Sequence, residues 1–236
     1  MLQWHYRSRD EQLIAFSNRH FYRSKLITFP NSHQNAPNRG VEFIHVPDGV
    51  YDRGGSRTNR VEARRVVDLV MEHAEQRPEE SLGVVAFSRA QWLAIHQEWD
   101  ARRRLRQDLE DFFKEDKDEP FFIKNLEEIQ GDERDVIFFS MGYGKDRNGK
   151  MVSTFGPVNR IGGERRLNVA VTRARNHVKF VASVMPEEID LSGSTSEGAR
   201  LLLRYMEYAL RGLGTLTGEV TESGREPETP FEEAVV

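Results

Sequence analysis

Short apolar runs that alternate with helical patterns are the feature that most restricts the fold of this sequence. Four runs are typical of buried strands, and "FFIKN" is a weaker fifth. Continuous apolar runs are expected of parallel strands that are covered on both faces. The runs are "VEFIHV" (41–46), "LGVVAF" (82–87), "DVIFFSM" (135–141) and "HVKFVASV" (177–184), with "FFIKN" at 121–125.

Apolar residues spaced by three and four predict helices between and around these strands, at 10–22, 59–76, 88–113 and 196–212. Strands that alternate with helices favour crossover connections and a parallel sheet. The sequence therefore predicts a three-layer α/β domain, with a mostly parallel sheet and helices on both faces.

The stretch "GGERRLNVAVTRARN" (162–176) combines an apolar stripe with four arginines. On a helix, Arg166 and Arg173 lie seven residues apart and point the same way. The apolar residues share a different face, and they are Leu167, Ala170, Val171 and Ala174. Two interpretations stay open at this point: an amphipathic helix with a solvated cationic side, or arginines that face a polyanion such as a triphosphate.

Composition limits the functional classes. The 236 residues suffice for one large domain or two small ones, and the net charge of −4 means that any nucleic-acid site must be a local patch. The chain contains no cysteine, which excludes disulfides and cysteine-ligated metals. No apolar run approaches the roughly 20 residues that cross a membrane, and the start has no signal-peptide core. A cytoplasmic protein without a metal site of its own is expected.

The segment "GKDRNGKM" (144–151) nearly fits a phosphate-binding loop. Met151 stands where a magnesium-ligating Ser or Thr belongs, and Asp146 places a negative charge inside the cradle. The residues that follow contain a proline and three glycines, so no helix N-terminus is expected to face a phosphate. We therefore predict that this segment is not a phosphate loop.

Three segments together carry a family resemblance. They are "LQWHYRSRDEQLIAFSNRHFYRSKLITFP", "NLEEIQGDERDVIFFSMGY" and "GGERRLNVAVTRARNHVKFVAS". In order and spacing they resemble motifs IV, V and VI of superfamily 1 helicases, in the branch that contains the nonsense-mediated-decay and replication helicases. The resemblance covers residues 2 to about 185 and implies a second RecA-like domain over 1–213. The first such domain, with Walker A and B, is expected upstream, so the isolated chain is expected to be inactive.

The resemblance also implies roles in an ATP site. Arg173 matches the arginine finger to the γ-phosphate and Arg7 a second γ-phosphate contact, while Tyr6 matches the residue that stacks on adenine. Gln130, Gly131 and Glu133 match the motif V residues, and the Glu133 carboxylate is implied to bind the ribose hydroxyls. Arg166 is expected to assist Arg173. Arg175 is expected to be a structural or surface residue, and Asp135 to be able to brace a neighbouring arginine. ATP and Mg²⁺ are expected to be held mainly by the first domain.

The nucleic-acid side rests on "FSRAQ" (87–91), which resembles an element that contacts single-strand phosphates at a helix N-terminus. Ser88 and Gln91 are the candidates, although N-capping alone would explain Ser88. Asn125 stands where the family usually has Ser or Thr against the strand. Four aromatic residues have helical spacing that favours core positions over stacking platforms: Trp92, Trp99, Phe112 and Phe113.

The acidic segment 214–236 is typical of a linker. Its end, "TPFEEAVV", resembles the opening helix of a Vsr-like nuclease domain, which favours DNA as the substrate. Two functions follow from the sequence. The leading one is the second motor domain of an ATP-dependent helicase, partnered by its first RecA-like domain and by single-stranded nucleic acid. The alternative is a non-catalytic adaptor that binds nucleic acid or protein through a RecA-like fold.

Overall fold

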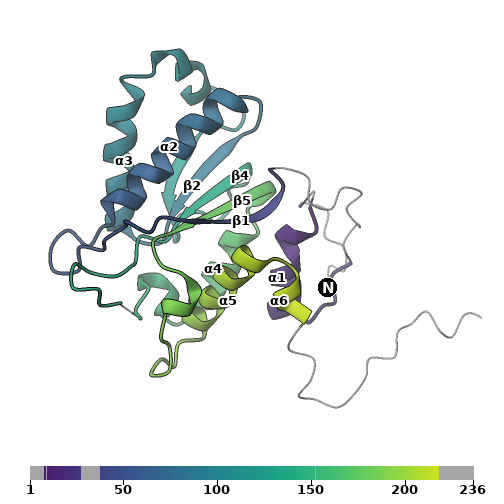
Figure 1. The fold of residues 1–236 in the computed structure, drawn as a ribbon. Coiled ribbons are helices and arrows are strands. Elements are labelled where there is room, and N and C mark those ends of the chain that lie inside the picture. Colours follow the sequence, from purple (N-terminus) through teal and green to yellow (C-terminus); the bar gives the residue numbers. More distant parts are fainter. Residues whose placement is uncertain (1–7, 9, 28–37, 152, 218–236) are drawn as a thin grey trace, which may run out of the picture.

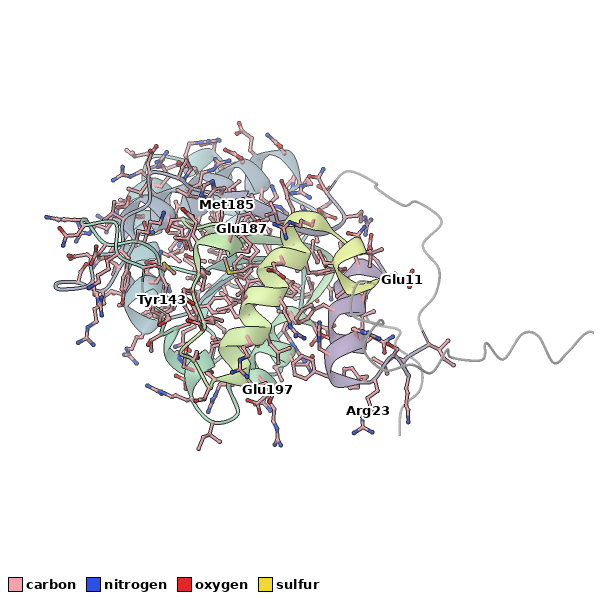
Figure 2. All side chains as sticks on the ribbon, turned by 60° about the horizontal axis from the view of Figure 1, so that its bottom comes forward. Glu11, Arg23, Tyr143, Met185, Glu187 and Glu197 are labelled. Atoms are coloured by element: carbon pink, nitrogen blue, oxygen red, sulfur yellow. The ribbon has the colours of Figure 1, made fainter. Side chains whose placement is uncertain are left out.

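The computed structural model describes residues 8, 10–27, 38–151 and 153–217, and they are built around one five-stranded parallel sheet (Figure 1). The strand order is β1-β5-β4-β2-β3, and each neighbouring pair is parallel. The strands are β1 (Gly40–His45), β2 (Leu82–Ala86), β3 (Phe122–Asn125), β4 (Arg134–Ser140) and β5 (Ala174–Ala182). All five predicted strands are confirmed, including the weaker run at 121–125.

Helices cover both faces of the sheet, which confirms the predicted three layers (Figure 1). One face carries α2 (Arg60–Gln76), α3 (Arg89–Arg103) and the 3-10 helix η1 (Gln107–Phe113). The other face carries α1 (Gln12–Phe21), α4 (Gly163–Val171) and α5 (Glu197–Arg211). The remaining short helices are η2 (Gly156–Asn159), η3 (Pro186–Glu188) and α6 (Gly214–Thr217).

The central strand β4 shows how the two cores are separated. Its side chains alternate, so that Val136 and Phe138 enter the core under α2 and α3, whereas Ile137 and Phe139 enter the core under α4 and α5. All four residues are completely buried. The near-continuous apolar run in the sequence thus reflects a strand that is covered on both faces.

The predicted helix over 88–113 is two elements in the structure. α3 ends at Arg103, and the chain turns before η1 begins at Gln107. The turn brings Leu109, Phe112 and Phe113 back onto the sheet, where all three are buried. Trp92 and Trp99 pack against the same core, which confirms that the four aromatic residues singled out in the sequence serve packing. Among the helices that the structure describes, none has the length and apolar character needed to cross a bilayer.

Candidate functional site

Arg173 lies on the turn between α4 and β5, at the edge of the sheet where the strands begin. The predicted helix over 162–176 ends earlier, at Val171, and Ala174 is the first residue of β5. The Thr172 hydroxyl donates to the carbonyls of Asn168 and Val169, both at 3.0 Å, and so satisfies groups that a helix end leaves without partners. The prediction that Ala174 shares the helix face was therefore wrong, although Ala174 is buried as expected.

Packing on both sides holds the backbone of Arg173 in place. Leu167, Ala170 and Val171 of α4 are buried before it, and β5 begins directly after it. The side chain is half-buried, and its Nε donates to the carbonyl of Val169 at 2.7 Å. One nitrogen of the guanidinium thus caps the last turn of α4, where a cation is favourable.

The loop of Gln130–Glu133 lies beside Arg173 at this amino edge. The backbone N–H of Arg134 donates to the carbonyl of Arg173 at 3.2 Å, which joins the start of β4 to the turn after α4. Gln130 and Gly131 are exposed, and Gly131 has a φ of +94°, in the left-handed region that favours glycine. The structure therefore brings together the motif V loop and Arg173, which are about forty residues apart in sequence.

Asp132, within this loop, and Arg134, directly after it at the start of β4, are tied to the protein through their side chains. Arg134 is buried, and its guanidinium donates to the carbonyl of Pro120 through Nε at 3.0 Å and Nη2 at 2.6 Å. Burial lowers the pKa of Arg134 from its ordinary value. Asp132 accepts from Lys124 Nζ at 2.6 Å. These contacts fix both ends of the loop.

Arg175, the second residue of β5, lies at the same amino edge and forms the centre of an ionic cluster. Its side chain is 18% exposed, and its nitrogens contact Glu119, Asp135 at 3.1 Å and Glu133 at 3.4 Å. Hydrogen bonding to Glu119 is the largest cause that raises the pKa of Arg175, and the same bond lowers the pKa of Glu119. The expectation that Arg175 is structural and that Asp135 braces an arginine agrees with this geometry. Glu119 was missed, because it lies in the acidic run "KEDKDE" with no signal that separates it from a solvated residue.

Arg166 lies at the opposite edge from Arg173. About five residues of α4, roughly 8 Å along the axis, lie between Arg166 and the end of the helix at Val171, and Arg173 follows that end. The Arg166 guanidinium donates to the carbonyls of Ile161 at 3.1 Å and Pro157 at 3.4 Å, and it lies 4.0 Å from Glu127. Residues that share a helix face need not share an edge of the sheet, so the prediction that Arg166 assists Arg173 does not agree with this geometry.

The carboxyl edge, where the strands end, carries Ser88, Gln91 and Asn125. Ser88 is the N-cap of α3, because its Oγ accepts from the backbone N–H of Gln91 at 3.1 Å. Ser88 remains half-exposed, and it also hydrogen-bonds the Tyr143 side chain. Asn125 is half-exposed at the end of β3, and its Oδ1 accepts from the backbone N–H of Glu127 at 2.9 Å.

Gln91 lies inside the protein and not on its surface. It is completely buried, and its side-chain amide donates to the Asn59 carbonyl and to Ser140 Oγ, both at 3.1 Å. Its Oε1 accepts from the backbone N–H of Asn59 at 2.8 Å. The helix start predicted for "FSRAQ" is confirmed, but the amide of Gln91 is committed to internal partners. Spacing alone cannot separate these two roles of an N-terminal glutamine.

Glu62 continues this network and was missed by the sequence reasoning. It lies on α2 with no exposed surface, and its Oε1 accepts from Ser140 Oγ and from the backbone N–H of Gly142, both at 2.7 Å. Among the described residues, its Oε2 has no partner at hydrogen-bond geometry, although the backbone N–H of Ser183 also favours the charged form of the carboxyl group. Burial raises the pKa of Glu62 to about 7. A signal existed, since Glu62 interrupts the apolar face of the helix at 59–76 only one residue before Ala63, which is also buried.

The segment 144–151 closes on itself in a turn that is held by its own aspartate. The Asp146 carboxylate accepts from the backbone N–H groups of Asn148 at 2.9 Å and Lys150 at 3.0 Å. No α-helix follows it within the described residues until α4 begins at Gly163. Tyr6 and Arg7, the predicted adenine and γ-phosphate residues of the N-terminal segment, lie outside the described residues.

Comparisons with known proteins agree with the resemblance at the level of the family. A family model described as an AAA domain matches residues 1–185. The chain is 37% identical over 221 residues to an uncharacterized ATP-dependent helicase of Mycoplasma genitalium, over 88% of this chain and 18% of that protein. It is 36% identical over 213 residues to the homologous helicase of Mycoplasma pneumoniae, with the same two coverages. The chain thus spans less than a fifth of the length of these curated relatives.

A solved structure gives a looser likeness. The C-terminal domain of a possible DNA helicase from Lactobacillus plantarum matches at 15% identity and a TM-score of 0.43. The match covers 82% of this chain and 91% of that one. A likeness at this level carries no argument about the site.

Proposed function

The chain belongs to the AAA domain family, and on that premise we propose that it is the second motor domain of an ATP-dependent nucleic-acid helicase. In this proposal the chain completes an ATP site whose triphosphate and Mg²⁺ are held mainly by a first RecA-like domain. Closing and opening of the cleft between the two domains then moves the motor along a single strand.

One observation carries the proposal. Arg173 and the loop of Gln130–Glu133 meet at the amino edge of the sheet, where Arg134 N–H bonds the Arg173 carbonyl and Arg175 bonds Glu133. A cationic fork and a carboxylate are thereby supplied to one edge from two distant segments. This pair of groups fits a nucleoside triphosphate, because a guanidinium stabilises dispersed phosphoryl charge and a carboxylate accepts hydrogen bonds from ribose hydroxyls.

The roles proposed for the individual residues follow the resemblance to the helicase motifs. Arg173 is the residue that acts on the γ-phosphate, with Arg7 as a second contact and Tyr6 on the base. Glu133 binds the ribose, and Gln130 and Gly131 form the exposed surface beside it. Hydrolysis of the terminal phosphoryl bond of ATP drives the motor. This chain contributes the groups that contact the nucleotide from the side of the cleft opposite the first domain.

The carboxyl edge is the proposed strand-binding side. Ser88 and Asn125 stand half-exposed at the ends of β2 and β3, where a phosphate backbone can reach the hydroxyl and the N-terminus of α3. Gln91 supports this edge from inside the protein. Single-stranded DNA is the favoured ligand, and the acidic segment 214–236 is proposed to link this domain to a nuclease-like domain.

The ribose contact gives a direct test. In the full-length protein, Glu133→Gln should raise the KM for ATP while leaving the KM for 3′-deoxy-ATP nearly unchanged, so that the preference for the full ribose is lost. Glu127→Gln, an exposed carboxylate at the other edge, is the matched control. Strand-stimulated ATP hydrolysis that is absent in the full-length protein would favour the adaptor instead.

A further inference from the structure

Two loops at the carboxyl edge are rich in cations that the motor site does not use. One loop, residues 50–60, follows β1 and leads into α2, and the other, residues 144–151, follows β4. The backbone N–H of Tyr51 donates to the carbonyl of Lys145 at 2.9 Å, which joins them side by side. We call these two segments the basic loop pair. Both leave the sheet at the same end, at the left of Figure 1.

The basic loop pair has a local excess of positive charge. Its six cations are Arg53, Arg57, Arg60, Lys145, Arg147 and Lys150, and its only two carboxylates are Asp52 and Asp146. Lys145 pairs with Glu188 outside the loops. Within the part of the chain that the structure describes, the other five cations make no salt bridge, and all five are exposed. In a chain with a net charge of −4, this is a local positive patch.

The two carboxylates of the pair are engaged by their own loops. Asp52 accepts from the backbone N–H of Ser56 at 2.8 Å and from its hydroxyl at 2.9 Å. Asp146 likewise accepts from two backbone N–H groups of its own turn. These bonds hold the loops closed. The two carboxylates also attract the neighbouring cations of the loops, and the excess of six cations over two anions remains.

Arg57 occupies a backbone conformation that an arginine rarely adopts. Its φ is +57°, in the left-handed region, although Gly54 and Gly55 lie three and two residues before it. Such a conformation costs roughly 1 kcal/mol for a residue with a Cβ. The closed loop enforces it, because the N–H of Arg57 donates to the carbonyl of Asp52 and the N–H of Asp52 donates to the carbonyl of Thr58, both at 2.9 Å. The Arg57 side chain is exposed at this closed loop.

A hollow of about 350 Å³ lies between the two loops, and Arg60 and Arg147 stand on its rim with Ser56 and Thr58. Arg60 is the first residue of α2, a helix of 17 residues, so the positive end of the helix dipole faces the same region. Asp52, Val50 and Val61 line the same hollow, so its two arginines and two hydroxyl groups stand beside one carboxylate. The excess of cations over anions and the hydroxyl donors suit contacts to phosphate groups.

Other arginines on the surface are arranged differently. On α3 and the turn after it, Arg102 bonds Asp68 at 2.8 Å, Arg103 bonds Glu110, and Arg106 lies 3.3 Å from Glu75. Three of the four arginines at the C-terminal end of α3 and in the turn after it are thus paired within the chain, and the exposed Arg104 makes no salt bridge among the described residues. The basic loop pair is therefore not a mere consequence of an arginine-rich sequence.

We propose that the basic loop pair binds the phosphate backbone of nucleic acid and extends the strand-binding edge beyond Ser88 and Asn125. The loops follow β1 and β4, whereas Ser88 and Asn125 follow β2 and β3, so all four segments lie along one carboxyl edge. The proposal rests on the proposed function only for the class of ligand. The contacts are made through charge to the backbone, so they carry no sequence preference.

The test compares two charge-matched triple variants of the full-length protein. Arg53, Arg57 and Arg147 are changed to Gln in the first, and Arg65, Arg102 and Arg106 in the second. Binding of a short and a long fluorescent single-stranded DNA is measured over a range of salt. Each lost contact to a single strand lowers the salt slope by about 0.7, so the first variant should lose about 2 from the slope for the long strand. Its affinity should fall about tenfold at low salt, with a smaller loss for the short strand.

Arg57→Gly separates binding from folding. Glycine removes the strain, so the melting temperature should stay the same or rise, while affinity for the long strand falls. Wild-type affinity and slope in the first triple variant would overturn the proposal, as would an equal loss in the second. Loss of binding to vesicles that contain anionic lipid, with DNA binding intact, would assign the patch to a membrane and overturn it as well.

The same measurements separate this inference from the strand side of the proposed function. A Ser88→Asp, Asn125→Asp double variant that binds the short strand normally would contradict the proposed strand path, while a loss in the first triple variant would still support the basic loop pair. Weaker binding of the short strand by the Ser88 and Asn125 double variant, together with normal binding by the first triple variant, would retain the proposed strand path and reject the role of the basic loop pair.

Discussion

The amino edge and the carboxyl edge of the sheet treat their charged groups differently. At the amino edge, the charge of Arg175 is matched within the chain by Glu119, Asp135 and Glu133. At the carboxyl edge, the buried groups form a network of uncharged side chains around Glu62, and the arginines of the basic loop pair stand outside it without salt bridges among the described residues. One edge fixes its ions in place, and the other leaves its cations accessible.

This difference suits two kinds of ligand. A nucleotide has a defined shape, and a site that reads it gains from groups that are already held in position. A strand is a repeating polyanion, and binding to it gains from accessible cations that displace counterions. A change at one edge should therefore alter ATP hydrolysis and strand binding to different extents.

The largest effect is expected at Arg173. In the full-length protein, Arg173→Ala should reduce strand-stimulated ATP turnover by about 10³–10⁵, the range found for arginine fingers. Arg173→Lys should restore little, because an ammonium cannot reproduce the planar fork. The melting temperature should change little, since the Arg173 side chain is only half-buried and the packing of α4 and β5 holds its backbone in place.

Arg166→Ala, which alters an arginine within α4, is the control for Arg173→Ala. Because Arg166 lies at the carboxyl edge, it should retain most of the turnover. Turnover that is lost in Arg166→Ala and retained in Arg173→Ala would reverse the assignment of the two edges.

Arg175→Ala should act on stability. It leaves three carboxylates close together without their shared cation. Because these side chains are 16% to 39% exposed, water screens part of the charge, and the expected loss is roughly 1–2 kcal/mol, below that of a fully buried pair. Chemical denaturation measures this loss. Arg65→Ala breaks the exposed pair with Glu72 and should change the free energy of unfolding by less than about 0.5 kcal/mol.

The cluster also predicts a pH dependence. The hydrogen bond from Arg175 lowers the pKa of Glu119; for Asp135, burial raises the pKa but the bonds from Arg175 and Ser81 outweigh it, so the net shift is also downward. Groups with a lowered folded pKa contribute stability above their unfolded pKa, near 4, and lose it as the pH falls through the folded value. Wild type should therefore lose more stability than Arg175→Ala between about pH 5 and pH 2. Parallel curves for the two proteins would show that the cluster does not hold these carboxylates.

Glu62→Gln tests the neutral network of the carboxyl edge, where stability is expected to fall as the pH rises and not as it falls. The folded pKa of Glu62 is raised from 4.5 to about 7, so its contribution is fully present below the unfolded pKa and is lost as the pH rises through about 7. A pKa shift of this size corresponds to about 3 kcal/mol of lost stability once the carboxyl group is ionised. A glutamine stays neutral, so it should regain about 1–2 kcal/mol of this loss, because its amide does not reproduce the hydrogen-bond geometry of a protonated carboxyl group. The variant should thus be more stable than wild type at pH 8 and similar at pH 4. A loss of stability at pH 8 would show that the carboxylate is held in its charged form.

The smallest effect is expected at Ser88, where capping and strand binding are both assigned to one hydroxyl. Ser88→Ala should lower the free energy of unfolding by about 1 kcal/mol through loss of the cap. Ser88→Asp keeps a capping oxygen but adds a negative charge, so it should retain stability and weaken strand binding. Normal strand binding by Ser88→Asp would leave Ser88 with the capping role alone.

The sequence predicted the elements well and their ends less well. The strand at 135–141 and the helix at 59–76 were found because burial on both faces and an amphipathic stripe leave clear periodic signals. The end of α4 was missed, since no Gly or Pro marks it and the Thr172 hydroxyl performs the capping. Ala174 satisfies the helical period and the strand equally, so only the sheet decides its place.

The sequence by itself determined the class of fold and the identity of the candidate residues, because hydrophobic period and motif spacing are local properties of the chain. It grouped Arg166 with Arg173, and it counted Gln91 among the residues that contact a strand. The tertiary structure decided which edge each side chain occupies, because that depends on how parallel strands from distant segments align their ends. It also decided which charges are neutralised: Arg175 meets Glu119 only after the sheet has formed, whereas the arginines of the basic loop pair meet no such carboxylate among the described residues.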